Sequence, residues 1–206
     1  MKFVEVAKFF DEIEKESSRT KITRLLAELL KKASPDEAAT ISYMSLGDLN
    51  PTYIGTQFNF AEKSMIKVLA KLLKESDSHI KTIASRAGDM GLVFEKENYN
   101  PKLEKELTVK NVDKELHEFE KISGIGSQEE KEKKLLEILK SLDAISAKYV
   151  VRIIIGKLRL GFSDMTLLDA FSWMELGDKS LRKILENAYN VSVDIGLIIK
   201  TLKEDG

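Results

Sequence analysis

Apolar side chains recur every three to four residues along most of the chain, which is the spacing of one face of an α-helix. Segments that alternate between apolar and polar residues are too short to predict a convincing strand. The pattern therefore predicts an all-α fold of roughly ten to twelve helices. The first predicted helix has one apolar face, formed by Phe3, Val6, Ala7, Phe10 and Ile13.

Residues that cap helices mark several of the predicted starts. Ser17 and Ser18 precede the second apolar repeat, and either could cap it because serine oxygens accept hydrogen bonds from the first N–H groups of a helix. The segment Ser34–Glu37 has the order of a capping box with proline at the first helical position. Asp77 or Ser78 is expected to cap a later, shorter helix.

A polar stretch from Glu95 to Glu106 interrupts the apolar periodicity and contains Pro101. We interpret it as a loop, because proline lacks the N–H group that a helix interior needs. The loop would separate two lobes, residues 1–94 and 107–206, within one domain that spans residues 1–206.

Charge and composition narrow the classes of function. Lysine and arginine (33) balance aspartate and glutamate (34), so a surface for nucleic acid would require segregated charge, since there is no excess of it. The absence of cysteine excludes disulfides, thiol nucleophiles and thiolate metal sites. The acidic amphipathic amino terminus and the lack of an eighteen-residue apolar run predict a cytoplasmic chain with no membrane partner.

Cations and apolar residues combine in one stretch of the chain, residues 145–171, and no carboxylate occurs between Asp143 and Asp164. Its four candidate DNA contacts are Lys148, Arg152, Lys157 and Arg159. On one continuous helix, a single stripe would contain Lys148, Arg152, Gly156 and Arg159. The rest of this helix is apolar, which predicts a buried helix with one exposed stripe. Gly156 either ends the helix or allows close approach of a bulky partner such as a phosphate backbone.

A second group of cations, Arg19, Lys21 and Arg24, lies at the start of the second predicted helix. Cations at a helix start oppose the helix dipole unless an anion docks there. One interpretation is therefore a DNA-phosphate contact, and the other is an ordinary solvated polar face.

The segment Ile122–Ser127 resembles a helix-hairpin-helix turn, in which backbone amides at the start of the next helix hold a phosphate. Gly124, Gly126 and Ser127 would then be DNA-binding amide donors. Alternatively, Ser127 and Glu130 form a capping box and the glycines serve only the turn.

The segment AKYVVRIIIGKLRLG, residues 147–161, is followed by TLLDA, and GDMGLV occurs earlier, at residues 88–93. These segments resemble the N-terminal DNA-binding domain of ATP-dependent DNA ligases, particularly the archaeal members. The resemblance implies an all-helical domain that grips the minor groove on both sides of a nick without reading its sequence. It also implies C-terminal adenylation and OB-fold domains, and a role in DNA replication, repair and recombination.

The resemblance implies that each of the two cation groups forms a rail, meaning a row of contacts to DNA phosphates. It also implies that the DNA backbone approaches the chain closely at Gly156 and Gly161. No cofactor is expected in this fragment, whereas ATP and magnesium are implied for the full-length ligase. The resemblance implies a protein of a prokaryotic cytoplasm of the archaeal type, associated with the nucleoid. A monomer is expected.

Several features of such ligases are not expected here. The loop at residues 96–106 lacks the glutamine and paired aromatics of a sliding-clamp-binding box. Lys203 begins a KEDG sequence like the ligase adenylation motif, but that chemistry needs a pocket and carboxylates from a following domain, so the fragment is predicted to be non-catalytic. Asp89 is expected in a turn or cap, and His79 and His117 predict no metal site.

Two other functions fit parts of the sequence. A helical scaffold could use the basic stripe to bind an acidic protein, although no fixed-period repeat supports it. A complete small enzyme is disfavoured because the residues supply no nucleophile–base pair.

Overall fold

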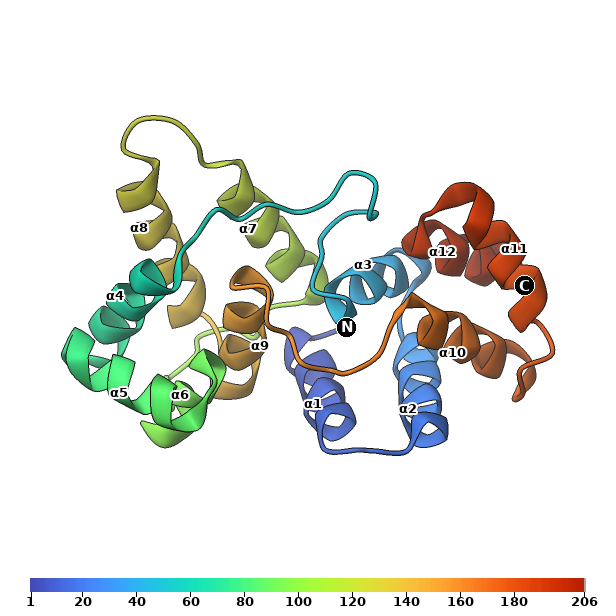
Figure 1. Ribbon diagram of the computed structural model, residues 1–206, viewed down its shortest axis with the longest axis horizontal. Coiled ribbons are helices and arrows are strands. Elements are labelled where there is room, and N and C mark those ends of the chain that lie inside the picture. Colours follow the sequence, from blue (N-terminus) through green and yellow to red (C-terminus); the bar gives the residue numbers. More distant parts are fainter. Residues whose placement is uncertain (206) are drawn as a thin grey trace. The chain divides into compact units, whose positions relative to one another are not determined.

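The computed structural model describes residues 1–205, and their regular secondary structure is almost entirely helical (Figure 1). Within this range there are twelve α-helices and one short 3₁₀ helix, η1. The extended structure in these residues is an isolated bridge between Lys2 and Thr108. The all-α prediction is therefore confirmed. None of the helices in residues 1–205 is long and apolar enough to cross a membrane.

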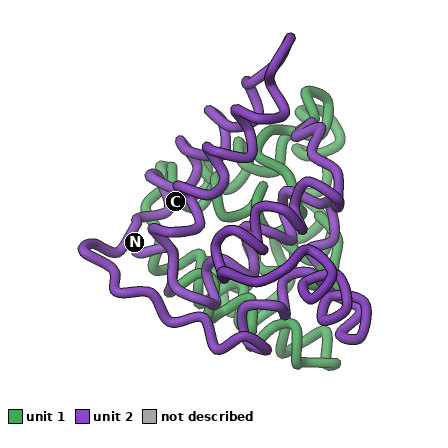
Figure 2. Tube along the Cα trace, turned by 90° about the vertical axis from the view of Figure 1, so that its left-hand side faces the viewer, with its two compact units in different colours: residues 1, 5–56, 159–206 green, residues 2–4, 57–158 purple. Residues whose placement is uncertain are grey.

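The chain forms two compact units (Figure 2). Unit 1 contains Met1 and residues 5–56 and 159–206, and unit 2 contains residues 2–4 and 57–158. This division corrects the expected lobes 1–94 and 107–206. The polar loop that suggested that boundary belongs wholly to unit 2, where Tyr99 Oη donates a hydrogen bond to the Leu139 carbonyl at 3.0 Å. Its polarity reflects a surface position within one unit.

Unit 1 joins helices from both ends of the chain. Tyr43 in α3 donates a hydrogen bond to Asp194, at the start of α12, and Gly196 lets the two helices approach because a Cβ there would lie 2.2 Å from Tyr43 Cζ. Likewise α2 packs against α10. Its helices are α1 (Phe3–Glu14, all but its first two residues), α2 (Arg19–Lys32), α3 (Pro35–Ser45), α10 (Asp164–Leu176), α11 (Arg182–Ser192) and α12 (Ile195–Asp205).

Local sequence signals explain where the unit 1 helices begin. Ser34 accepts a hydrogen bond from the Glu37 N–H and Glu37 returns one to the Ser34 N–H, so the predicted capping box is confirmed. Ser18 is the N-cap of α2, and Ser163 is the N-cap of α10. The predicted apolar face of α1 is buried throughout.

Unit 2 surrounds the buried helix α9. The side chains of Tyr149, Val150 and Val151 are 0% exposed, as expected for a helix that is apolar on most sides. The N-cap of α5 is Ser76, which lies just before the two predicted positions, Asp77 and Ser78. The helices of unit 2 are α4 (Glu62–Leu73), α5 (Asp77–Ala87), η1 (Met90–Leu92), α6 (Val93–Lys96), α7 (Val109–Lys121), α8 (Ser127–Lys140) and α9 (Ala144–Ile154).

Candidate nucleic-acid interface

Helix α9 ends before the predicted stripe is complete. Its last residue is Ile154, Gly156 has a φ of 68°, and the Lys157 N–H donates to the Arg152 carbonyl at 2.9 Å. Gly156 is therefore the residue at which the chain leaves the helix, as one of its two interpretations predicted. The prediction that Arg159 shares a helical face with Lys148 is wrong, because the helix does not reach it.

Arg152 is not on the surface. Its side chain is 1% exposed, and its guanidinium donates to both carboxylate oxygens of Asp89, with Nε 3.3 Å from Oδ1. Asp89 also caps η1 by accepting a hydrogen bond from the Gly91 N–H at 2.8 Å, which confirms the predicted cap. The exposed position predicted for Arg152 is therefore wrong, since a buried charge needs a paired carboxylate and here has one.

The other unit 2 cations of the predicted rail are also engaged. Lys148 is only 8% exposed, and its Nζ lies 5.1 Å from the ring centroid of Tyr149. Lys157 is exposed and forms an ion pair with Glu62, at the start of α4. These residues do not form the open track that their spacing predicted, because most of α9 faces the interior of unit 2.

Arg159 and Gly161 belong to unit 1, together with the second cation group. Arg159 is exposed and has a φ of 63°, and Gly161 follows with a φ of 73°. Two left-handed residues in this short segment turn the chain toward the start of α10. The boundary between units thus separates Arg159 and Gly161 from the cations of α9.

The starts of α2 and α10 border one small cavity of unit 1. Its volume is about 160 Å³, and it is lined by Arg19, Ile22, Gly161, Phe162, Ser163 and Thr166. Within residues 1–205, the Arg19 guanidinium and the hydroxyls of Ser163 and Thr166 form no hydrogen bond with another side chain or carbonyl. Because the first N–H groups of a helix also lack helical partners, this place suits an anionic oxygen ligand.

The remaining cations of α2 have defined neighbours. The Arg24 guanidinium lies 4.6 Å from the ring centroid of Trp173 in α10, a cation–π contact that holds it while the residue stays exposed. Lys21 Nζ is 3.4 Å from Glu16 Oε2. The pKa of Glu16 is lowered, chiefly by the hydrogen bond from the Ser18 N–H, so this carboxylate is charged and weakens the positive potential at Lys21.

The Ile122–Ser127 turn lacks the capping box that one of its two interpretations included. Gly126 is the N-cap of α8, with no side-chain cap, so the predicted capping box of Ser127 and Glu130 is wrong. Gly124 and Gly126 have φ values of 94° and 81°, which only glycine adopts readily. The Ser127 N–H donates to the Gly124 carbonyl at 3.2 Å, so it is not an open donor for a phosphate. Glu129 and Glu130 in the first turn of α8 also oppose an incoming phosphate.

His79 has neighbours that the sequence did not predict. Its Nε2 lies 3.1 Å from Glu97 Oε1, and the ligand atoms of Glu75, His79 and Glu97 lie within 4.8 Å of one another. All three residues are at least partly exposed, and such groups are common without a metal. We interpret the histidine–carboxylate contact as a hydrogen bond that joins α5 to the end of α6.

The sequence missed several residues around the cavity. Neither Thr166 nor Trp173 was assigned a role. The glycine-containing turn before α10 was the available signal. Taken together, the fold and this site define an all-helical domain that presents a cation and unpartnered polar groups at adjoining helix starts, a class suited to binding phosphate groups.

The comparisons with known proteins identify the family. Residues 2–172 match the family described as "DNA ligase N terminus", and the chain belongs to that family. Similar proteins include a probable DNA ligase of Persephonella marina (36% identity) and DNA ligase 1 of Methanosarcina acetivorans (35% identity). Both alignments cover 100% of this chain.

The chain spans only about a third of the length of these relatives, 36% and 35% respectively. DNA ligase 2 of Thermofilum pendens, at 35% identity, is matched over 98% of this chain and 35% of its own length. In each case the matching region is the N-terminal part of the relative. Relatives occur in both bacteria and archaea, so the expected archaeal origin is not singled out.

Proposed function

We propose that this chain binds duplex DNA without sequence preference, as the N-terminal DNA-binding domain of an ATP-dependent DNA ligase. The observation that carries the proposal is the unit 1 cavity, where Arg19 and Gly161 meet at the starts of α2 and α10. A phosphate oxygen there would accept hydrogen bonds from the guanidinium, the Ser163 and Thr166 hydroxyls and free helical N–H groups. Contacts to phosphate oxygens carry no information about the bases, so binding through these donors would be independent of sequence.

The neighbouring cations extend this site beyond one phosphate. Arg24 is held by Trp173, and Lys21 and Arg159 are exposed on the same unit. Phosphates along a strand are spaced regularly, so several cations at helix starts would track a backbone. Lys157, Gly156 and the amides at Gly124 and Gly126 remain candidate contacts of unit 2, whereas Arg152 is assigned to its core and the Ser127 N–H already donates to the Gly124 carbonyl.

We propose further that the complete protein seals nicks in duplex DNA. The relatives are named DNA ligases, and most of their length lies beyond the region that this chain matches. ATP and magnesium would then act in that further region. The Lys203 ammonium does not suit nucleotide attachment, because Nζ donates to the Leu30 carbonyl at 3.0 Å and lies 3.5 Å from that of Lys31, at the end of α2.

The experiment is a binding titration of nicked and intact duplex of the same sequence at several salt concentrations. Replacing Arg19 with alanine is expected to weaken binding to both duplexes and to reduce the dependence of log K on log salt by about one unit. Arg86→Ala is the matched control, because Arg86 is an exposed arginine in the last turn of α5 and its loss changes net charge equally.

Equal effects of the two substitutions would show that only the net charge matters and would overturn the cavity as the binding site. A preference for one DNA sequence over another would contradict the proposed mode. Unchanged binding of Arg19→Ala at every salt concentration would also reject it.

A further inference from the structure

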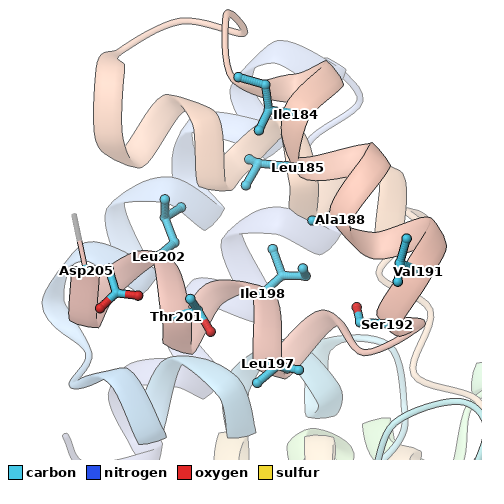
Figure 3. A pocket seen from close by; sticks show the side chains of 10 residues that line it. All are labelled: Ile184, Leu185, Ala188, Val191, Ser192, Leu197, Ile198, Thr201, Leu202 and Asp205. Atoms are coloured by element: carbon cyan, nitrogen blue, oxygen red, sulfur yellow. The ribbon is translucent and has the colours of Figure 1, made fainter.

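An apolar groove runs between α11 and α12 on unit 1 (Figure 3). Its volume is about 620 Å³, and Figure 3 shows side chains of the two helices facing each other across it. Residues from α11 and α12 line it: Ile184, Leu185, Ala188, Val191, Ser192, Leu197, Ile198, Thr201, Leu202 and Asp205. The only charged residue in this lining is Asp205, so the groove has no group that would attract phosphate.

Much of this lining is open to solvent. Ile184 is 65% exposed, Val191 is 88% exposed and Leu197 is 50% exposed. Three branched aliphatic side chains on one groove form a contiguous apolar surface, in contrast to the scattered single residues that are normal on proteins. Covering each such side chain contributes about 1.5–3 kcal/mol when its burial is complete. The groove is therefore suited to an apolar polypeptide segment.

The relatives indicate which segment this is. They continue for almost two thirds of their length beyond the region matched by this chain. The last turn of α12 carries Asp205, which itself lines the groove, so polypeptide that continues from α12 starts beside the binding surface. A segment attached there has an effective concentration of order millimolar, at which even a small interface is occupied.

A separate protein or a second copy fits the groove less well. Ten residues line it, whereas a stable interface between separate proteins uses about 20–30 residues from each partner. A small apolar interface is sufficient when the two surfaces belong to one chain, because most of the loss of translational freedom on association is then avoided. These considerations favour an intramolecular occupant.

We propose that the α11–α12 groove docks apolar side chains of the polypeptide that follows this domain in DNA ligases, so that the next domain is held against unit 1 before DNA binds. The inference rests on membership of the ligase family. It is independent of the proposed phosphate site, since the groove residues and the cavity residues do not overlap.

Thiol labelling tests this directly, because the chain has no cysteine of its own. Single cysteines are introduced as Val191→Cys and Leu197→Cys in the groove and as Ile125→Cys at a fully exposed position of unit 2. Each variant is prepared as the 206-residue chain and as the same chain continued by the segment that follows the matched region in the Persephonella marina protein. Labelling rates at each introduced cysteine are followed by peptide mass spectrometry, without DNA.

Labelling at positions 191 and 197 is expected to slow by about tenfold or more in the longer protein, as a docking equilibrium constant of about 10 requires. Labelling at position 125 should stay within about twofold, which separates local docking from general shielding. Equal rates in the short and long proteins, or equal slowing at all three positions, would overturn the proposal. Concentration-dependent slowing in the 206-residue chain would overturn it in favour of a second copy.

The DNA titration described above is run on the same proteins and reports on the phosphate site separately. Normal DNA binding with an unprotected groove would reject the docking proposal alone. Protection of the groove without DNA binding would reject the proposed function and leave the docking proposal standing. Circular dichroism spectra that match the unsubstituted chain are required of each variant before its labelling rate is compared.

Discussion

Replacing Asp89 with alanine is expected to lower the free energy of unfolding by about 3–5 kcal/mol, the range for removing one partner of a buried ion pair. Arg152 is 1% exposed, so without the carboxylate its charge would remain in the interior of unit 2. Asp89 also accepts the hydrogen bond from the Gly91 N–H that caps η1, and losing a cap costs about 0.5–2 kcal/mol. The two losses act in the same direction.

A second substitution separates charge from capping. In Asp89→Asn the amide oxygen can still accept the Gly91 hydrogen bond, while the negative charge is lost. This variant should therefore be destabilised mainly by the unpaired guanidinium. Combining Asp89→Ala with Arg152→Met removes both charges, and the double variant should be more stable than the sum of the single effects predicts, since partners in contact are not additive.

Urea unfolding followed by circular dichroism at 222 nm measures these differences for the helical fold. Glu62→Ala is the control, because it removes the partner of Lys157 in an exposed ion pair, and such pairs contribute about 0–1 kcal/mol. A loss at Asp89→Ala no larger than at Glu62→Ala would refute the buried pair as a stabilising contact. Additive single and double effects would refute the coupling between the two residues.

Two further predictions concern unit 1. Gly161→Ala and Gly177→Ala place a Cβ at φ values of 73° and 74°, so each should destabilise by about 1–2 kcal/mol, but only Gly161→Ala should also weaken duplex binding in a titration. Equal binding by both variants would contradict the cavity assignment. Burial, followed by the hydrogen bond to Asp164, raises the pKa of Tyr189 to about 12. Its contribution to stability is therefore complete below the ordinary pKa of about 10 and is lost as pH rises from there toward 12. Unfolding free energies measured from pH 8 to 11 should thus fall less steeply for Tyr189→Phe, and parallel curves would contradict this.

Local sequence patterns predicted the helices well. The apolar face of α1 and the capping box of Ser34 and Glu37 depend on residues within a few positions of one another, so their outcome did not require knowledge of the fold. The same holds for Gly156, whose two interpretations included the helix end that it forms. Errors at this level were small, such as the cap of α5 at Ser76.

The same local patterns could not predict contacts between residues that are far apart in the sequence. Arg152 and Asp89 are 63 residues apart, and only the folded unit brings the carboxylate to the guanidinium. Periodicity along α9 correctly predicted a buried helix, but it could not show whether cations on that helix reach solvent or pair internally. The division into units could not be predicted for the same reason, because α2 and α10 pack together although they are far apart in the sequence.

The candidate site therefore combines residues that were predicted to belong to two separate groups. Arg19 and Gly161 were assigned to separate rails, yet they line one cavity because α2 and α10 start side by side. Sequence reasoning supplied the residue types and the phosphate chemistry, whereas the pairing of helix starts came from the fold.

The segments by which this chain resembles DNA ligases contain core residues as well as surface ones. Gly91 belongs to GDMGLV, and a Cβ there would lie 2.9 Å from the Lys148 carbonyl and 3.1 Å from Arg152 Nε, so its absence lets η1 pack against α9. The resemblance to DNA ligases at Gly91 and Arg152 therefore reflects the internal packing of unit 2. Phosphate contacts have to be sought among exposed members of the same segments, and Gly161 is one that also borders a cavity with an unpaired guanidinium. Variants that separate stability from duplex affinity consequently test which of these residues would contact DNA under the proposed function.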